Sequence, residues 1–291
     1  VKVEIDRAAR RANVTILGPA EPPPADIAGL HAAGDGFWSL RLARELDDAI
    51  LELRSNERDI GVIVFRSQGS AELVLAYDKF LLGHSGDWLA REILNNWKRV
   101  LKRIDLTSRS LVALVDAGSC FAGTLAEVAF ACDRSFMFAG TRKGDNRTPA
   151  TITLGEVNFG RYPMSNGISR LATRFLGEPG AVETLRAAAG TSYDADESEQ
   201  VGLVTIAFDE VDWDDEVRIF LEERASFSAD GLTGMEANLR FAGPETMETK
   251  IFGRLTAWQN WIFQRPNAAG AEGALKRYGS GLKANFDPER V

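Results

Sequence analysis

The sequence predicts an α/β protein whose parallel strands are covered by helices on both faces. Two short runs, residues 61–65 and 111–115, are continuously apolar and bounded by turn residues. Each run follows a longer segment in which apolar residues recur three and four positions apart, which is the spacing of an amphipathic helix. Strands that are apolar on both faces and alternate with helices are typical of a parallel sheet buried on both sides.

The elements are expected in the following order. The chain starts with a hairpin of strands 1–5 and 14–17, and a helix from Leu40 to Leu53 then precedes strand 61–65. A helical stripe from Trp88 to Ile104 precedes strand 111–115; a helix at 124–131, a strand at 135–138, a polar loop at 141–149 and a strand at 151–154 follow. Helical signals at 168–175 and 181–189, an acidic stretch at 194–199 and a last strand at 203–208 complete a predicted core of residues 1–210.

Residues 211–291 are predicted to form a helical C-terminal region of two or three helices, with a long one starting at Pro244. Three aromatic residues, Trp258, Trp261 and Phe263, fall within six positions of this region. Core packing is the commoner role of such tryptophans, but clustered aromatic residues are also enriched where large surfaces are buried between proteins. We expect residues 244–263 to pack against another part of a complete protein.

Composition excludes several classes of function. The net charge is −8 and the pI is near 5.1, so nucleic acid and anionic membranes are unexpected partners. No run approaches the 18 or so apolar residues of a membrane span, and no signal-peptide pattern opens the chain, so a cytoplasmic protein is expected. Cys120 and Cys132 are expected to be buried thiols, and His31 and His84 are too isolated for a metal site. The first residue is Val1 rather than Met, which suggests a processed product or a piece of a longer protein.

Two places combine a strand end, small residues and a carboxylate. In the first, strand 111–115 leads into a helix that opens near Thr124, where unpaired backbone N–H groups could stabilise an oxyanion, and Glu127 follows in the first turn. A capping box of Thr124 and Glu127 explains the same residues without any function. In the second, Glu156 follows strand 151–154 and, taken alone, is a surface turn residue.

Together these segments resemble the crotonase (enoyl-CoA hydratase/isomerase) superfamily. The string that ends Glu127-Val-Ala-Phe-Ala-Cys-Asp133 is similar to the family's Ala-x-Gly-Gly-Gly-x-Glu-Leu-Ala-x-x-Cys-Asp helix. The string Gly155-Glu156-Val-Asn-Phe-Gly160-Arg-Tyr-Pro163 is similar to its Pro-Glu-x-x-x-Gly-x-x-Pro segment, and Leu75-Ala76-Tyr77-Asp78 to its Ser-Ala-Gly-Ala-Asp loop. The resemblance covers roughly residues 1–230 and implies a crotonase-like ββα spiral core.

Within the superfamily, residues 119–124 and 243–261 look most like lyases of aerobic benzoate degradation, which open the ring of an oxygenated benzoyl-CoA and release formate. Those proteins are longer, and the resemblance falls on their C-terminal half. It implies a coenzyme A thioester substrate, no other cofactor and no metal, with another crotonase-like half or subunit as partner in a homo-oligomer. It also implies that the N–H groups of Tyr77 and Thr124 hold the thioester oxygen while Glu127 and Glu156 move protons.

Departures from the family pattern leave alternatives open. The Gly-Gly-Gly run appears as Gly123-Thr124-Leu125, and its side chains narrow the approach to a thioester. A polar insertion at 143–146 lengthens the segment between the two glutamates. A non-catalytic scaffold half is therefore as well supported as direct catalysis, and a plain enoyl-CoA hydratase or isomerase is the other enzymatic alternative. We expect Glu127 and Glu156 to face each other across a constricted pocket that binds thioester weakly or not at all.

Overall fold

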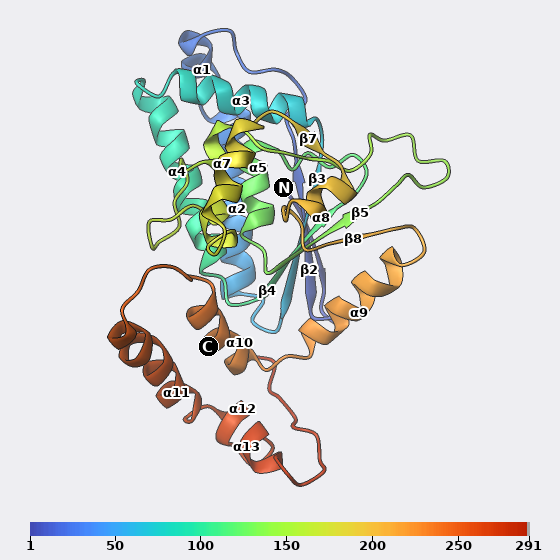
Figure 1. Ribbon diagram of the computed structural model, residues 1–291, viewed down its shortest axis with the longest axis vertical. Coiled ribbons are helices and arrows are strands. Elements are labelled where there is room, and N and C mark those ends of the chain that lie inside the picture. The colour runs from blue at the N-terminus through green and yellow to red at the C-terminus, as the bar shows by residue number, and fades with distance from the viewer. Residues whose placement is uncertain (290–291) are drawn as a thin grey trace.

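The computed structural model describes residues 1–289 and is built on a six-stranded sheet with the order β1-β2-β3-β4-β5-β8 (Figure 1). The strands are β1 (Lys2–Asp6), β2 (Arg11–Leu17), β3 (Val62–Gln68), β4 (Ser110–Val115), β5 (Arg134–Phe138) and β8 (Ile206–Phe208). β1 and β2 pair antiparallel as the predicted hairpin, and every other neighbouring pair is parallel. The predicted α/β class is confirmed.

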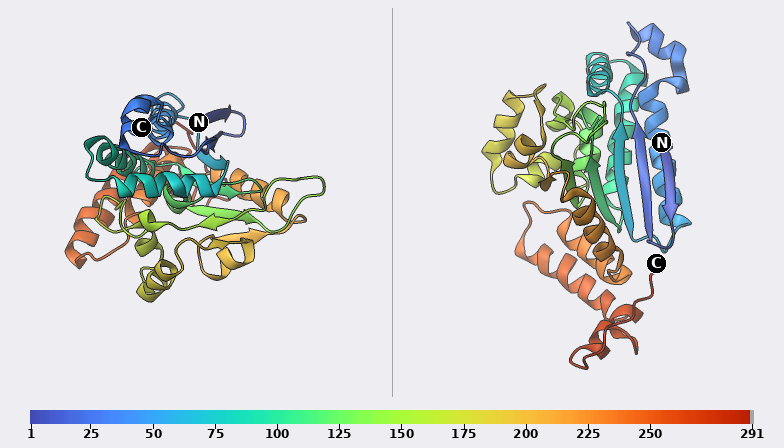
Figure 2. Two further views of the ribbon diagram at one scale, coloured as in Figure 1. Left: turned by 90° about the horizontal axis from the view of Figure 1, so that it is seen from above. Right: turned by 90° about the vertical axis from the view of Figure 1, so that its right-hand side faces the viewer.

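Helices cover both faces of this sheet (Figure 2). On one face, α2 (Trp38–Ser55) and α4 (Trp88–Asp105) pack on alternate residues of β2 and β3, such as Val14 and Phe65. On the other face, α9 (Trp213–Ala225) packs on the opposite set, such as Val64 and Leu114. Burial on both faces explains why these strands are apolar at every position.

Helix α3 (Ala71–Gly83) is a difference from the sequence expectation, because part of it, residues 75–78, resembles a family loop. Ser70 caps the helix by accepting a hydrogen bond from the Leu73 N–H at 3.3 Å. Val74, Tyr77 and Leu81 lie on the buried side, three and four positions apart. The segment is therefore an ordinary amphipathic helix with a standard cap.

Short elements surround the remaining predicted motifs. Helix α5 (Gly123–Phe130) follows β4. A small antiparallel sheet of β6 (Ile152–Thr153) and β7 (Ser192–Tyr193) lies beside the start of α5. The 3-10 helix η2 (Glu156–Asn158) follows β6 in the chain. The other helices before α9 are α1 (Ile27–Ala33), η1 (Gly34–Gly36), α6 (Arg170–Arg174), α7 (Pro179–Ala187) and α8 (Ala195–Gln200). The predicted helices and strands at these positions are confirmed, apart from shifts of a few residues at their ends.

Residues 229–289, which we call the C-terminal arm, extend away from the sheet (Figures 1 and 2). The arm contains α10 (Ala229–Leu239), the π-helical segment η3 (Thr249–Leu255), α11 (Thr256–Ile262), α12 (Pro266–Ala269) and α13 (Ala274–Arg277). The single long helix predicted from Pro244 is thus divided between η3 and α11. None of the helices among the described residues is long and apolar enough to cross a membrane.

Candidate functional site

The N-terminus of helix α5 is packed tightly against a carboxyl group of helix α3. Gly123, the first residue of α5, has a φ of +47°, and a Cβ at this position would lie 2.0 Å from Oδ2 of Asp78. Only glycine combines this backbone conformation with so close a neighbour. The one glycine retained from the family's three therefore makes room for Asp78.

Asp78 accepts a hydrogen bond from the Thr124 backbone N–H, which the family resemblance assigned to the thioester oxygen. The Thr124 N–H donates to Asp78 Oδ2 at 2.7 Å, and the Thr124 hydroxyl donates to Asp78 Oδ1 at 2.5 Å. Tyr162 places its hydroxyl 3.1 Å from that of Thr124. Burial raises the pKa of Asp78 to about 7, with the hydrogen bonds from Thr124 opposing the shift and Glu127 adding to it.

Tyr77, the second predicted oxyanion donor, lies in the interior of α3. A backbone N–H at such a position donates to the carbonyl four residues earlier, so it is not directed into a cavity. Its side chain packs against Phe37 and Trp38, with ring centroids 5.1 and 4.9 Å away. The structure does not bring the N–H groups of Tyr77 and Thr124 together as an oxyanion hole, because residue 77 is helical rather than part of a loop.

Glu127 belongs to a buried ion-pair network. One carboxylate oxygen accepts a hydrogen bond from Asn158 at 2.8 Å, and the other accepts one from Arg170 at 3.0 Å. Arg170 also binds both oxygens of Asp105, at 3.0 and 2.6 Å, and donates to the carbonyl of Tyr162. One guanidinium thus serves two carboxylates, and burial raises the pKa of Glu127 although Arg170 and Asn158 oppose the shift. This arrangement joins α4, α5 and α6.

Glu156 is exposed and lines a cavity of about 610 Å³ at the start of η2. Leucines 75, 82 and 154 form its apolar wall, and its charged lining residues are Asp78, Lys79 and Glu156. Glu127 is not a lining residue and is only 1% exposed. The expectation that Glu127 and Glu156 share a pocket is therefore wrong. The carboxyl group that lines this cavity together with Glu156 is that of Asp78.

Asp78 is the residue that the sequence reasoning did not assign to the site. A signal for it exists, because it matches the Asp of the family's Ser-Ala-Gly-Ala-Asp loop. Its role could not be deduced from that match, since the contact with Thr124 joins residues 46 positions apart.

The two thiols offer no nucleophile at neutral pH. Cys120 is buried as expected, and burial raises its thiol pKa to about 11; Cys132 is partly exposed as a residue, and burial of its thiol also raises the pKa. Within residues 1–289, no three His, Cys, Asp or Glu side chains gather closely enough to hold a metal ion.

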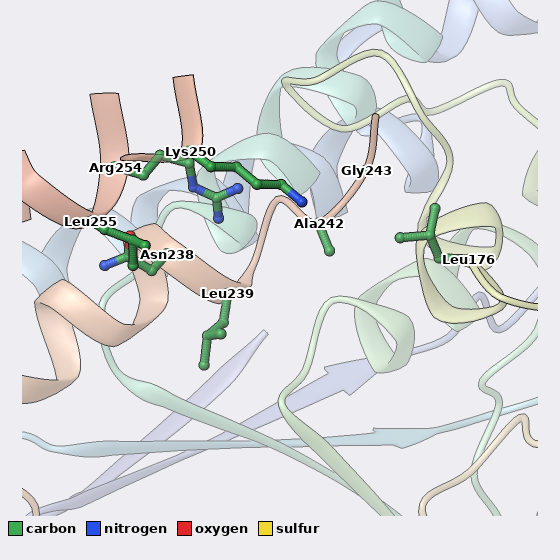
Figure 3. Close-up of a pocket in the computed structure, with 8 residues that line it drawn as sticks. All are labelled: Leu176, Asn238, Leu239, Ala242, Gly243, Lys250, Arg254 and Leu255. Carbon is green, nitrogen blue, oxygen red and sulfur yellow. The ribbon is translucent and has the colours of Figure 1, made fainter. Parts of the chain in front are cut away.

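A second hollow lies between the core and the C-terminal arm (Figure 3). Its volume is about 300 Å³, and Leu176 of the core faces Leu239 and Leu255 of the arm across it. These three leucines are 47%, 68% and 57% exposed. Asn238, Lys250 and Arg254 also line it, so the hollow is an open surface of mixed apolar and basic character.

Comparisons with known proteins agree with this architecture. No protein-family model matches the chain. A benzoyl-CoA-dihydrodiol lyase from Aromatoleum evansii is 47% identical over 291 residues, which cover 100% of this chain and 52% of that protein. The chain thus spans about half the length of this curated relative.

Solved structures show the same fold at low sequence identity. An enoyl-CoA hydratase from Bacillus anthracis has a TM-score of 0.65 at 14% identity, with 99% of each chain covered. An enoyl-CoA hydratase/isomerase from Marinobacter aquaeolei has a TM-score of 0.64 at 16% identity, with 98% of this chain and 97% of that chain covered. The chain has the crotonase fold, and the resemblance inferred from its motifs is confirmed.

Proposed function

We propose that this chain, a crotonase-fold relative of half of a benzoyl-CoA-dihydrodiol lyase, is the companion half of a two-half enzyme. The complete enzyme would open the ring of an oxygenated benzoyl-CoA thioester and release formate. In this proposal the present chain supports the thioester-binding half and does not itself hold the thioester carbonyl. It follows that the catalytic acid and base of the reaction lie outside residues 127 and 156.

The contact between Asp78 and Thr124 carries this proposal. An oxyanion hole acts through donors that lie about 2.7–3.1 Å from the oxygen on which charge develops. Here the Thr124 N–H is already bonded to a carboxyl oxygen at 2.7 Å. A thioester oxygen could reach this donor only if Asp78 moved away, and an ionised Asp78 would repel the developing negative charge.

Glu127 supports the same conclusion. A general base must reach the substrate proton directly or through one water molecule. Glu127 is turned toward Asn158 and Arg170 instead, and it does not border the cavity. The glutamate at the family's motif position therefore acts in this chain as part of a structural network.

The hollow in Figure 3 is consistent with a supporting role. Exposed leucines from the core and the arm line it together with Lys250 and Arg254, and exposed apolar side chains rimmed by polar residues mark protein contacts. We propose that another crotonase-like half or a second copy of the chain covers it.

Direct catalysis by this chain is the second candidate. The cavity of about 610 Å³ favours it, since it has an apolar wall and two carboxyl groups, one of them with a pKa of about 7. A group that titrates near neutral pH is suited to acid–base work. A ring-opening lyase or a plain hydratase or isomerase could use such a cavity.

Filling the cavity in the complete two-half protein distinguishes the candidates. Ala189 lines the cavity, so Ala189→Trp would obstruct it without altering a buried polar group. The companion role predicts one benzoyl-CoA bound per polypeptide by calorimetry, with stoichiometry and kcat unchanged within about twofold in the variant. Exposed Ala187, which does not line the cavity, provides the control Ala187→Trp. Loss of binding or of kcat in Ala189→Trp alone, with its thermal midpoint retained, would establish direct catalysis.

A further inference from the structure

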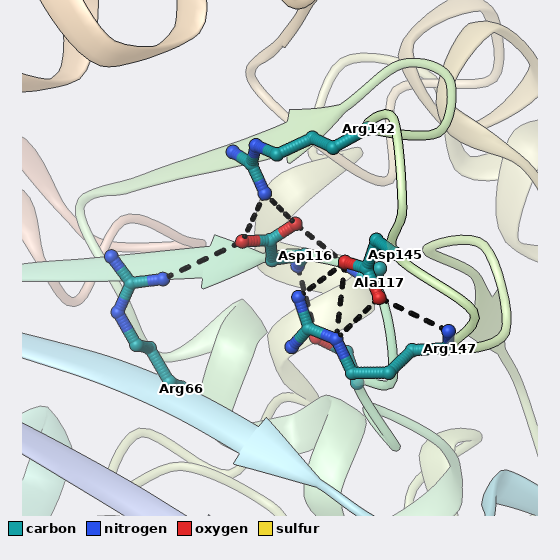
Figure 4. A network of polar contacts seen from close by, with 7 residues as sticks. Arg66, Asp116, Ala117, Arg142, Asp145 and Arg147 are labelled. Atoms are coloured by element: carbon teal, nitrogen blue, oxygen red, sulfur yellow. Dashed lines mark hydrogen bonds and ion pairs between the residues drawn. The ribbon is translucent and has the colours of Figure 1, made fainter.

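A cluster of arginines lies at the carboxyl ends of the parallel strands and does not line the cavity described above. The inference drawn from it does not depend on the proposed function. Arg66 lies near the carboxyl end of β3, whereas Arg142 and Arg147 belong to the polar loop that follows β5 (Figure 4). Asp116, directly after β4, lies between Arg66 and Arg142, and Asp145 lies beside Arg147. This is a concentration of positive charge on a protein whose net charge is −8.

The two carboxylates of the cluster make their hydrogen bonds to groups other than Arg66. Asp116 accepts hydrogen bonds from Nη1 of Arg142 at 2.8 and 2.9 Å, and one from the Ala117 N–H at 2.7 Å. Asp145 accepts three side-chain bonds and one backbone bond from Arg147, between 2.6 and 3.1 Å. Three guanidinium groups are thus balanced by two carboxylates.

Arg66 has the longest carboxylate contact of the three arginines. Its nearest carboxylate oxygen, on Asp116, is 4.0 Å away, and no hydrogen bond from its guanidinium reaches any other residue between 1 and 289. The side chain is 37% exposed, so its N–H groups can be approached from solvent. Burial lowers the pKa of the Arg66 guanidinium; Asp116 opposes the shift, and Arg11, Arg142 and Arg147 add to it. An added anion would relieve this repulsion.

The surroundings hold the cluster in place. The Arg142 guanidinium stacks on Phe138, 4.1 Å from the ring centroid, while Asp116 binds it from the side. Gly118 has a φ of +75°, and a Cβ there would lie 3.2 Å from Cδ of Arg147, so a glycine leaves room for that side chain. Arg142 and Arg147 are therefore positioned before any ligand arrives, which reduces the entropic cost of binding.

The location is also one at which α/β proteins bind ligands. Arg66 lies near the carboxyl end of β3, Asp116 follows β4, and the loop carrying Arg142 follows β5, so the cluster lies at the carboxyl ends of three neighbouring parallel strands. We propose that Arg66, with Arg142 and Arg147, forms a binding site for the phosphoryl group of a small molecule. The planar fork of an arginine matches two phosphoryl oxygens, and the third oxygen remains available to a neighbouring guanidinium.

The charge of the cluster limits the number of phosphoryl groups that the ligand can present to it. A single guanidinium without hydrogen-bond partners suits one phosphoryl group, whereas a nucleic acid would bring many phosphates against an acidic protein. Inorganic phosphate and a phosphoryl group carried by a larger molecule, such as coenzyme A, share the required chemistry. Separate titrations with inorganic phosphate and with coenzyme A distinguish these two ligands.

Calorimetry of the full chain at low ionic strength tests the site. We expect saturable binding of inorganic phosphate at one site, weakened at least tenfold in Arg66→Gln and less in Arg66→Lys, which keeps the charge but loses the fork. Arg218→Gln is the matched control, because Arg218 is 54% exposed and already pairs with two carboxylates on α9. Tighter binding of coenzyme A than of phosphate, lost in Arg66→Gln, would identify the phosphoryl group of a larger ligand.

Three results would overturn the proposal. They are the absence of saturable binding of both probes, unchanged affinity in Arg66→Gln, and equal weakening in Arg218→Gln, which would indicate non-specific charge attraction. Thermal midpoints of the variants must match that of the parent chain, so that altered binding is not confused with altered folding. Arg66→Lys keeps the test decisive if Arg66→Gln proves unstable.

Discussion

The α/β core and the C-terminal arm differ in how far their apolar side chains are buried. In the core, helix α4 buries Trp97, Val100 and Ile104 completely against the sheet and α2. In the arm, Leu239, Met247 and Phe252 are 68%, 69% and 70% exposed. The core is therefore stabilised by contacts within the chain, whereas the arm presents surface that a partner could bury.

The core also contains two kinds of buried carboxyl group. Glu127 and Asp105 share the guanidinium of Arg170, whereas Asp78 has only the N–H and hydroxyl of Thr124. A buried carboxylate with a counter-ion can remain charged, whereas one with hydrogen bonds alone holds its proton to higher pH. The first group should be sensitive to loss of its partner and the second to pH.

The largest effect is expected when the counter-ion is removed. Arg170→Met would leave Glu127 and Asp105, which are 1% and 0% exposed as side chains, without their cation. Breaking a buried ion pair in this way costs about 3–5 kcal/mol. Urea unfolding at pH 7 measures this loss, which should decrease as the pH falls, because burial raises the pKa of both carboxyl groups and favours their neutral forms.

Arg218→Met is the matched control for this prediction. Arg218 forms two ion pairs on the surface of α9, and such pairs contribute about 0–1 kcal/mol. Equal losses in the two variants would show that the buried network does not stabilise the core.

Asp78 should make the stability of the core depend on pH. Its folded pKa is about 7 against an ordinary value of 3.8, so the unfolded chain releases this proton first. The contribution of Asp78 is therefore fully present below pH 4 and lost as the pH rises toward 7. A shift of about 3 units corresponds to about 4 kcal/mol.

Asp78→Asn should remove that dependence. The amide oxygen can accept from the Thr124 N–H, and the amide nitrogen can donate to the Thr124 hydroxyl, so both contacts are retained. Relative to the parent chain, we expect the variant to gain stability between pH 4 and 8, up to about 4 kcal/mol, by urea unfolding at several pH values. Parallel stability curves for the two proteins would mean that Asp78 ionises normally.

Asp145→Asn provides a control of opposite sign. Hydrogen bonds from Arg147 lower the pKa of Asp145 to about 2, so its contribution is present above the unfolded pKa and is lost as the pH falls. Its replacement should therefore lower stability by a constant amount from pH 6 to 8, and urea unfolding should show this difference shrinking as the pH falls below about 4.

A substitution in the C-terminal arm should change the affinity of association more than the free energy of unfolding. Leu239→Asp places a charge in the hollow of Figure 3, at a side chain that the chain itself leaves 68% exposed. We expect a change in unfolding free energy within about 0.5 kcal/mol, and at least a tenfold weaker self-association or assembly with the other half. Sedimentation at several concentrations measures the association.

Val211→Asp is the control, because Val211 is 84% exposed and lies outside the hollow. A parent chain that sediments as a monomer at every concentration, and that does not bind the complementary half, would show that the hollow is not an interface.

Local patterns predicted most of the fold. The apolar run 111–115 and the stripe from Trp88 to Ile104 gave β4 and α4 because strand and helix periodicities depend only on neighbouring residues. Helix α3 was not predicted, since the resemblance of residues 75–78 to a family loop obscured the cap at Ser70 and the apolar spacing that follows.

The candidate site was less accessible to sequence reasoning. Glu156 lines a cavity of about 610 Å³, whereas the sequence predicted a constricted pocket shared with Glu127. The commitment of Glu127 to Arg170 joins residues 43 positions apart, and no local pattern encodes such a contact. Family motifs therefore located the site, whereas its electrostatics depended on long-range partners.

The smallest effect is expected at Glu156, and it separates the companion role from catalysis. Glu156→Gln preserves the shape of an exposed side chain and removes its charge, so its cost in stability should be within about 0.5 kcal/mol. If Glu156 moved a proton during the reaction, the loss of kcat would be about 10²–10⁴-fold. Because the Thr124 N–H is already bonded to Asp78, we expect kcat of the complete enzyme to change by less than about twofold. Steady-state kinetics over a range of pH measures kcat. A hundredfold or larger loss of kcat in Glu156→Gln would show that the reaction takes place in the cavity of this chain.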